Sequence, residues 1–345
     1  MNVVVSTPDA IVTAAQALEA GRLVAFPTET VYGLGADAEN AAAVADIYKA
    51  KGRPSDHPVI VHVAPGADIR YWAKDIPHEA DQLIAAFWPG PLTLILKRAD
   101  HIPDAVSGGQ DTVGIRCPSH PVAQQLLLAF KNGKGGVAAP SANKFGHVSP
   151  TLAQHVAEEF TQEILPGGLI AAVLDGGQSE VGIESTIVDL SRLATHGPVL
   201  LRPGQISTAQ LSEVLGVTPA SPDAAAPRAS GTLDAHYAPQ TPVVQVAVAE
   251  LDNVAAQLQA KGKTIALLSY QPHPGIVALA VRRLPADAAG YAHDLYAGLR
   301  ELDHAHADLI LVEAIPQDKE WLGVNDRLRR AAFDSRDVLQ KILQA

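Results

Sequence analysis

Short apolar runs separated by amphipathic stretches recur through most of the chain. The runs have the length of β-strands. They cover residues 3–5, 23–26, 59–63, 92–96, 113–115, 171–174 and 185–190. Between several of them, apolar residues recur at helical spacing. This spacing predicts helices at 9–20, 40–50, 79–87, 121–130 and 152–160. Strands and helices that alternate in this way predict an α/β protein with a mixed sheet.

Residues that favour helix ends support two of these helices. Gly21 follows the helix predicted at 9–20 and can end it, because glycine readily adopts the left-handed conformation. Asn40 precedes the next helix and can accept hydrogen bonds from its first N–H groups. Gly52 is placed to end that helix.

The pattern breaks after about residue 204 and resumes near residue 242. A short helix is predicted at 208–215, and the Pro- and Ala-rich stretch at 219–227 has no periodicity and is typical of a linker. The resumed pattern predicts strands at 243–248, 264–268 and 309–312, with helices at 251–260 and 291–302. We therefore expect a larger α/β domain at 1–206, a linker at 207–241 and a smaller α/β domain at 242–345.

Composition narrows the function classes. The 345 residues carry 26 Lys and Arg against 37 Asp and Glu, so the net charge is 26 − 37 = −11. A broad phosphate-binding surface for nucleic acid is disfavoured by this charge, so any anion site must be local. The single cysteine, Cys117, excludes a disulfide framework and a cysteine-rich zinc site. Without a recognisable signal peptide or membrane span, the chain is expected to be soluble and cytoplasmic, with no membrane partner.

Three polar loops interrupt the apolar pattern of the first domain. One follows the strand at 23–26 and combines hydroxyls, a carboxylate and glycines over 27–35. Lys51 and Arg53 form a Lys-x-Arg pair, and Ser141 and Asn143 form a Ser-x-Asn pair. In extended backbone, residues two apart point to the same side, so each pair could face one ligand. The alternatives are a basic helix end and a Ser-x-Asn turn.

Two further arginines lie at strand ends, where ligands commonly bind in open α/β sheets. Arg116 ends the strand at 113–115, with a surface ion pair as the alternative, and Arg202 ends a strand just before Pro203. Ser185 and Thr186 open another strand with two hydroxyls. Together with Lys51 and Arg53, the two arginines favour a cationic pocket in an otherwise acidic protein.

Several common catalytic devices are absent from the sequence. It contains neither a Walker-type phosphate loop nor a Gly-x-Ser-x-Gly nucleophile elbow. His304 and His306 form a His-x-His pair without a carboxylate cluster, which favours a solvated helix face over a metal site. Cys117 has no histidine partner at a telling spacing and is expected to be buried. Covalent catalysis and a protein-ligated metal are therefore not expected.

Taken in order, these loops resemble the YrdC/Sua5 family, in its two-domain Sua5 form. The similar segments are residues 26–35, 51–54, 88–93, 140–143 and 184–189. The Lys-x-Arg and Ser-x-Asn signatures of the family are intact. Residues 231–239 resemble the family's His-Tyr-Ala-Pro segment, and the likeness continues into the C-terminal domain. The resemblance therefore covers nearly the whole chain.

The resemblance implies both a fold and an activity. The fold would be a YrdC-like twisted mixed sheet around a concave cavity, followed by a smaller Rossmann-like domain. The activity would be that of a nucleotidyltransferase, an L-threonylcarbamoyladenylate synthase. It would convert L-threonine, bicarbonate or CO₂, and ATP with Mg²⁺ into threonylcarbamoyl-AMP and pyrophosphate. The product would pass to a tRNA threonylcarbamoyl transferase complex for t6A37 modification, with weak or absent tRNA binding by this chain itself.

Family site residues can be carried over by motif position. The resemblance implies that threonine meets Thr30, His62, Arg116 and Ser185, with Arg116 on its carboxylate. It implies that the nucleotide meets Lys51, Arg53, His57, Thr112, Ser141, Asn143, Ser149 and Arg202, and that Tyr237 covers it. His57 stands where the family often has asparagine. Residues 231–234 also depart from the family, because some relatives have a more basic stretch there.

The implied chemistry suits these side chains. A carbamate formed from threonine is short-lived, so the site must hold it beside the α-phosphate of ATP. Lys51 and Arg53, with Mg²⁺ held largely by phosphates and water, would stabilise the charge that shifts onto the phosphates. Closure of Tyr237 over the cavity would exclude water from the mixed anhydride.

Two other function classes remain as alternatives. An RNA-binding or ribosome-assembly module could use the same cationic hollow, although the net charge of −11 disfavours it. A carbamoyl-adenylate-forming enzyme of hydrogenase maturation would use carbamoyl phosphate. That family carries cysteine-rich zinc segments, and the single cysteine of this chain disfavours it.

Overall fold

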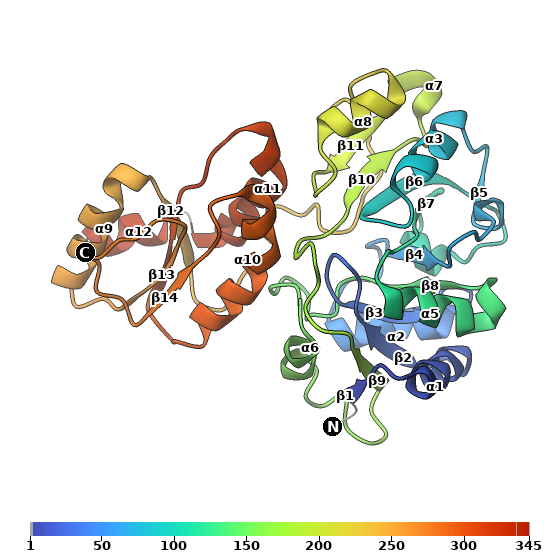
Figure 1. Cartoon of the computed structure of the whole chain (residues 1–345), viewed down its shortest axis with the longest axis horizontal. Helices are drawn as coiled ribbons and strands as arrows, with labels where there is room; N and C mark the ends of the chain where they lie inside the picture. Colours follow the sequence, from blue (N-terminus) through green and yellow to red (C-terminus); the bar gives the residue numbers. More distant parts are fainter. Residues whose placement is uncertain (1–2, 336, 345) are drawn as a thin grey trace. The chain divides into compact units, whose positions relative to one another are not determined.

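The computed structural model describes residues 3–335 and 337–344, which fold into two compact units (Figure 1). The first unit comprises residues 1–145 and 150–232, and the second comprises 146–149 and 233–345. The chain therefore leaves the first unit briefly at 146–149 before it returns. Among the described residues, no helix has both the length and the apolar character needed to cross a membrane.

An eleven-stranded mixed sheet forms the first unit. Its strands are β1 (Val3–Val5), β2 (Leu23–Phe26), β3 (Gly33–Asp37), β4 (Ile60–Val63), β5 (Ala73–Lys74), β6 (Leu92–Arg98), β7 (Thr112–Arg116), β8 (Gly136–Ala138), β9 (Ile170–Asp175), β10 (Thr186–Asp189) and β11 (Val199–Arg202). The spatial order is β1-β9-β2-β3-β8-β4-β7-β6-β10-β11, and β5 pairs with β6. The sheet contains both parallel pairs, such as β4 with β7, and antiparallel pairs, such as β6 with β7. The prediction of a mixed α/β sheet is confirmed.

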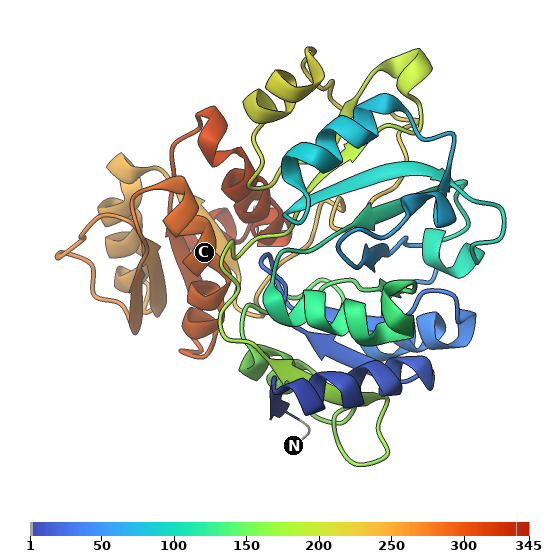
Figure 2. The same ribbon diagram turned by 45° about the vertical axis from the view of Figure 1, so that its right-hand side comes forward.

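Helices cover this sheet and bury its apolar side chains. They are α1 (Pro8–Glu19), α2 (Ala41–Lys51), α3 (His78–Phe87), α4 (Asp104–Ser107), α5 (Pro121–Ala129), α6 (Ala153–Glu159), α7 (Leu193–His196) and α8 (Thr208–Leu215). Two of them, α1 and α5, lie side by side (Figure 2). Leu18 of α1 and Leu126 of α5 share a buried cluster with Phe26 of β2. This cluster fixes the strand from which the loop at 27–32 departs.

The predicted ends of α2 are confirmed. The Asn40 side chain accepts hydrogen bonds from the N–H groups of Ala42 and Ala43. Gly52 adopts φ 62° and ψ 32°, a left-handed conformation that glycine enters without a Cβ clash. The chain therefore turns sharply after Lys51, which is the last residue of the helix.

Strand β3 corrects the sequence prediction, which treated Gly33 to Gly35 as part of a loop. The segment pairs with β2 on one side and β8 on the other. A Cβ atom at Gly35 would lie 2.7 Å from Val137 and 2.8 Å from the ring of Phe26. Glycine is therefore required here by close packing inside a sheet. The short strands β8 and β5 were also not predicted.

The second unit contains a four-stranded parallel sheet. Its strands are β12 (Val243–Val246), β13 (Ile265–Ser269), β14 (Ala280–Arg283) and β15 (Leu309–Glu313), in the order β12-β15-β13-β14. The helices α9 (Val248–Ala260) and α12 (Val338–Gln344) cover one face, and α10 (Ala288–Asp303) and α11 (Leu322–Ala331) lie on the other (Figure 1). The expectation of a smaller open α/β domain is confirmed, whereas β14, α11 and α12 were not predicted.

Candidate active site

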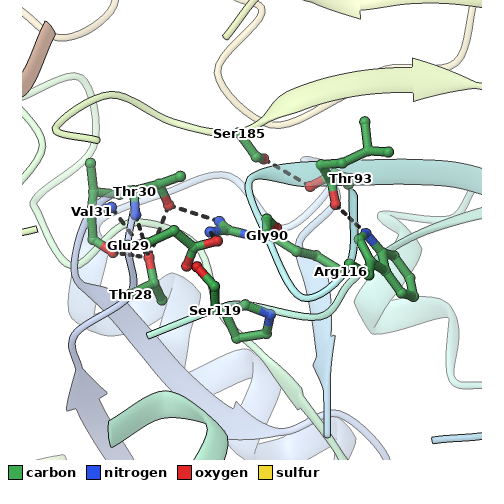
Figure 3. Close-up of polar contacts among 12 residues, drawn as sticks. Thr28, Glu29, Thr30, Val31, Gly90, Thr93, Arg116, Ser119 and Ser185 are labelled. Atoms are coloured by element: carbon green, nitrogen blue, oxygen red, sulfur yellow. Dashed lines mark hydrogen bonds and ion pairs between the residues drawn. The ribbon is translucent and has the colours of Figure 1, made fainter. Parts of the chain in front are cut away.

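Arg116 is the centre of a buried polar cluster in the first unit (Figure 3). It ends β7, and its Nη2 lies 2.8 Å from Oε1 of Glu29, in the loop after β2. Its Nη1 donates to Oγ1 of Thr30 over 2.8 Å, and its Nε donates to the carbonyl of Gly90 over 3.4 Å. The Arg116 and Glu29 side chains are only 4% and 3% exposed. The ion pair is therefore buried, unlike the surface pair considered from sequence.

The charge of Glu29 is maintained by its neighbours. Burial raises the pKa of this carboxyl, but the Arg116 charge, a hydrogen bond from Arg116 and the backbone of Ser119 outweigh it, so the net pKa is lowered. Thr28, one residue earlier, lies 2.9 Å from Thr30 between hydroxyl oxygens and donates to the carbonyl of Val31 over 2.6 Å. The loop that the sequence identified as a site is thus internally hydrogen-bonded around Arg116.

His62 lies next to Arg116, because the two residues are register partners across β4 and β7. Burial, with a smaller effect of the Arg116 charge, lowers the pKa of His62 to about 3. The imidazole is therefore neutral at pH 7. Its Nδ1 lies 3.2 Å from the carbonyl of Ile60. The backbone of Val137 also hydrogen-bonds the ring, so the single N–H of the neutral imidazole is shared between two carbonyl partners, and the other ring nitrogen is an acceptor.

A second cluster joins Ser185 to Arg202, two residues to which the sequence assigned different ligands. Arg202 donates from Nη2 to Oγ of Ser185 and from Nε to its carbonyl, both over 3.0 Å. Its Nη1 donates to the carbonyl of Ser230 over 2.6 Å. The hydroxyl of Thr93, on β6, lies 2.8 Å from that of Ser185 (Figure 3). The guanidinium thus links the start of β10 to the segment around Ser230, near the C-terminal end of the first unit.

Lys51 ties the Lys-x-Arg segment to the Ser-x-Asn segment. Its Nζ donates to the carbonyl of Ser141 over 2.6 Å and also to the carbonyl of Asn143. In return, the Lys51 carbonyl accepts from the N–H of Phe145 over 2.9 Å. Burial lowers the pKa of Lys51 well below its ordinary value, and the charge of Arg53 lowers it further. Two signatures about ninety residues apart therefore form one structural unit.

The expectation that Lys51 and Arg53 share one side of an extended segment is wrong. Lys51 is helical and Gly52 is left-handed, so the two side chains diverge. Arg53 instead donates to the carbonyl of Pro58 over 2.8 Å and to the hydroxyl of Ser230 over 3.5 Å. Ser230 therefore contacts both Arg53 and Arg202.

The remaining nucleotide candidates of the first unit lie at two places. Thr112 begins β7 and lines a small space together with Ser230. His57 packs its ring against Phe145, with ring centroids 5.5 Å apart. Burial, and then the charge of Arg53, lowers the pKa of His57.

Ser149 and Tyr237 belong to the second unit. Tyr237 has a positive φ of 61°. Its ring lies 5.6 Å from the ring of Tyr296, between centroids, and the guanidinium of Arg327 lies 5.6 Å from its centroid. Within that unit, the carbonyl of Gly146 accepts a hydrogen bond from the N–H of Ala238 over 3.0 Å.

Sequence reasoning missed Glu29 and Thr93 as site residues. Glu29 stood in the polar loop at 27–35, but no spacing indicated that it would pair with Arg116 eighty-seven residues later. Thr93 stood inside the apolar run at 92–96 and in the family-like segment at 88–93, but no role was assigned to it. Ser230 lay in the linker and had no pattern at all.

Cys117 is buried, as expected, and burial raises the pKa of its thiol to about 12. Among the described residues, no three His, Cys, Asp or Glu side chains are grouped to hold a metal.

Buried charges and hydroxyls gathered along a mixed sheet, as in an α/β protein with an internal polar site, are joined here to a second α/β unit. Residues 16–204 match the family described as Telomere recombination (Sua5_yciO_yrdC), and residues 206–333 match the family described as Threonylcarbamoyl-AMP synthase, C-terminal domain. The chain belongs to this two-domain Sua5 family.

Relatives of similar length support this membership. The chain is 39% identical to a threonylcarbamoyl-AMP synthase of Pyrococcus abyssi over 92% of this chain and 93% of the relative. It is 38% identical to a threonylcarbamoyl-AMP synthase of Bacillus subtilis over 93% and 92% of the two chains. A crystal structure of Pyrococcus abyssi Sua5 complexed with L-threonine matches with a TM-score of 0.85 and 36% identity, over 94% of this chain and 95% of that one.

Proposed function

We propose that this protein is an L-threonylcarbamoyladenylate synthase. It joins L-threonine and bicarbonate or CO₂ to the AMP part of ATP and releases pyrophosphate. The relatives named for this activity cover more than nine-tenths of the chain. Threonine is the ligand named for the similar Pyrococcus abyssi structure.

The observation that carries the proposal is the contact between Arg202 and Ser185. The Arg202 guanidinium donates to the Ser185 hydroxyl over 3.0 Å. Ser185 is the proposed threonine residue, and Arg202 is the proposed nucleotide residue. Carbamate attack on the α-phosphorus needs the amino acid and the triphosphate side by side, so a residue pair that joins their two sites is what this chemistry requires.

The proposed amino-acid site combines a donor with neutral acceptors. Arg116 supplies N–H groups that suit the carboxylate of threonine. Neutral His62 and the hydroxyl of Thr30 can accept hydrogen bonds from the rest of the molecule. Ser185 and its partner Thr93 extend the site toward Arg202.

The proposed nucleotide site is cationic. Arg53, Arg202 and Lys51 would face the phosphates, with Thr112, Ser141 and Asn143 as neutral partners and His57 at its border. When a carbamate oxygen attacks the α-phosphorus and the bond to pyrophosphate breaks, negative charge moves onto the leaving group. Fixed cations in a water-poor site stabilise that charge without reorganisation. Mg²⁺ enters as part of the ATP substrate, held by phosphate oxygens and water.

The test is pyrophosphate release by purified full-length protein with Mg²⁺ and ATP. Threonine and bicarbonate are omitted in turn, and the nucleotide product is identified by mass spectrometry. Release that needs both substrates and yields the mass of threonylcarbamoyl-AMP is expected. Release without threonine, or release only with carbamoyl phosphate, would overturn the proposal. Salt-dependent RNA binding by a folded protein that releases no pyrophosphate would support the RNA-binding alternative.

We further propose that the adenylate is handed to a tRNA threonylcarbamoyl transferase. A mixed carbamic-phosphoric anhydride is prone to hydrolysis, so a cell gains from immediate transfer to the acceptor nucleoside. The net charge of −11 disfavours strong tRNA binding by this chain. Adding purified tRNA alone should therefore leave the rate of pyrophosphate release unchanged.

A further inference from the structure

The direction of the hydrogen bonds around Thr30 can be worked out from the number of protons. The Thr28 hydroxyl has one proton, which goes to the carbonyl of Val31 over 2.6 Å. In the 2.9 Å contact between Thr28 and Thr30 the donor is then Thr30, although the Thr28 oxygen already accepts from the N–H groups of Thr30 and Val31 over 3.2 Å each. Thr30 also accepts from Arg116 over 2.8 Å. Thr30 therefore keeps one lone pair with which it can accept from a ligand.

Glu29 offers acceptors at the same place. It is the neighbour of Thr30 in the chain, and both are bonded to the same guanidinium. A carboxylate has about four lone-pair positions, of which Arg116, the backbone of Glu29 itself and the backbone of Ser119 engage three, so one is left for a ligand. Figure 3 shows the Glu29 and Thr30 side chains meeting at the Arg116 fork. Three of the five guanidinium N–H groups are directed to Glu29, Thr30 and Gly90, which leaves two for a ligand.

The charges of this cluster balance without a ligand. Buried Glu29 is negative and buried Arg116 is positive, while His62 is neutral. A zwitterionic amino acid adds no net charge to the cluster. A hydroxy acid would add an unbalanced negative charge, which is costly in a buried site.

We infer that Glu29 and Thr30 form an acceptor face that recognises the α-ammonium group of the substrate, while Arg116 recognises its carboxylate. This inference rests on the proposed threonine-dependent function and adds Glu29 as a specificity-determining residue. The face selects the zwitterion by charge. Glu29 needs a positive partner once a ligand carboxylate shares Arg116, and a hydroxyl can donate a hydrogen bond but brings no charge.

The test compares two ligands that differ at one position. L-threonine carries the α-ammonium group, and 2,3-dihydroxybutanoate carries a hydroxyl there with the carboxylate unchanged. Their affinities are measured by calorimetry on the full-length protein and on Glu29→Gln. Loss of a charged hydrogen-bond partner should weaken threonine binding by roughly ten- to a hundredfold. The affinity for dihydroxybutanoate should stay the same or rise, because glutamine keeps the shape but removes the repelling charge.

Glu213→Gln is the matched control, because Glu213 is an exposed glutamate on α8. It should bind both ligands as the unchanged protein does. A merely structural role for Glu29, through holding Arg116 in place, would weaken both ligands by the same factor. That result, or unchanged threonine binding by Glu29→Gln, would overturn the inference.

A second pair of variants keeps the test decisive if Glu29→Gln does not fold. Thr30→Val removes the acceptor, whereas Thr30→Ser keeps it. Threonine binding should be lost in the first and retained in the second, and equal binding by both would contradict the acceptor face. If the unchanged, folded protein does not bind threonine at all, the proposed function itself fails. If it binds threonine but Glu29→Gln binds equally well, only the inference fails.

Discussion

The ammonium nitrogen of Lys51, whose side chain is buried, lies 2.6 Å from the main-chain oxygen of Ser141. A lysine that donates to carbonyls has a structural task besides any contact with phosphate. It holds the Ser-x-Asn loop against the end of α2, so its two roles must be separated by experiment.

Lys51→Ala should therefore lower both stability and activity. Carbonyls of Ser141 and Asn143 would lose a buried donor, which costs about 1–3 kcal/mol of unfolding free energy. Chemical denaturation followed by circular dichroism measures this loss, and pyrophosphate release measures the activity. Lys49→Ala is the control, because Lys49 is exposed on the same helix. A fully stable Lys51→Ala protein would contradict the structural role.

Arg202→Lys should reduce turnover although the charge is kept. Three guanidinium nitrogens bind Ser185 and Ser230, and a single ammonium group cannot reach all three acceptors. We expect a loss of roughly ten- to a hundredfold in kcat/KM, the effect of one or two charged hydrogen bonds. Steady-state rates with threonine and ATP varied separately would measure it. The exposed Arg70 provides the matched control, Arg70→Lys, which should behave as the unchanged protein does.

Neutral His62 makes the folded state sensitive to acid. Its pKa is about 3 in the folded protein, below the ordinary value of 6.5, so the unfolded chain binds the proton first as pH falls. The stabilisation is complete above pH 6.5 and is lost progressively toward pH 3. At pH 5 the loss from this residue is about 2 kcal/mol. In denaturant titrations at pH 7 and pH 5, the unfolding free energy of His62→Gln should decrease less than that of the unchanged protein. An equal decrease in the two proteins would contradict burial of the neutral imidazole.

Gly35→Ala should destabilise the first unit. The added Cβ would approach Val137 and Phe26 to less than 3 Å, inside a sheet that cannot expand locally. Overpacking of this kind costs about 1–3 kcal/mol, visible as a lower Tm in thermal unfolding. Gly275→Ala is the control, because a Cβ there has nothing within 4 Å. Equal Tm values for the two variants would show that β3 tolerates the change.

Local sequence patterns predicted the helices and strands whose buried faces consist of regularly spaced apolar residues. Asn40 and Gly52 marked the ends of α2, because capping and left-handed backbone depend on the residue itself. The second unit was harder to predict from pattern. Helix α11 turns Arg327 and Arg330 inward, where they are buried, so its buried face reads as polar in the sequence. Binary patterning cannot recognise such a face.

The site was predictable by residue type but not by partner. Arg116 and Arg202 were identified from their places at strand ends, whereas their contacts with Glu29 and Ser230 depend on how distant strands are ordered. The sheet order places β7 between β4 and β6, so one of its two neighbours in space, β4, is distant in the sequence. Only a fold can supply that information.

The excursion of residues 146–149 means that the backbone passes between the two units three times, after residues 145, 149 and 232. Shortening the chain at Thr232 would therefore not remove a simple appendage. The four residues that follow the Ser-x-Asn loop would lose the N–H of Ala238 and the guanidinium of Arg300, which bind the carbonyls of Gly146 and Val148. The second unit is thus mainly a C-terminal segment of the chain, but it also includes residues 146–149, which lie between two segments of the first unit.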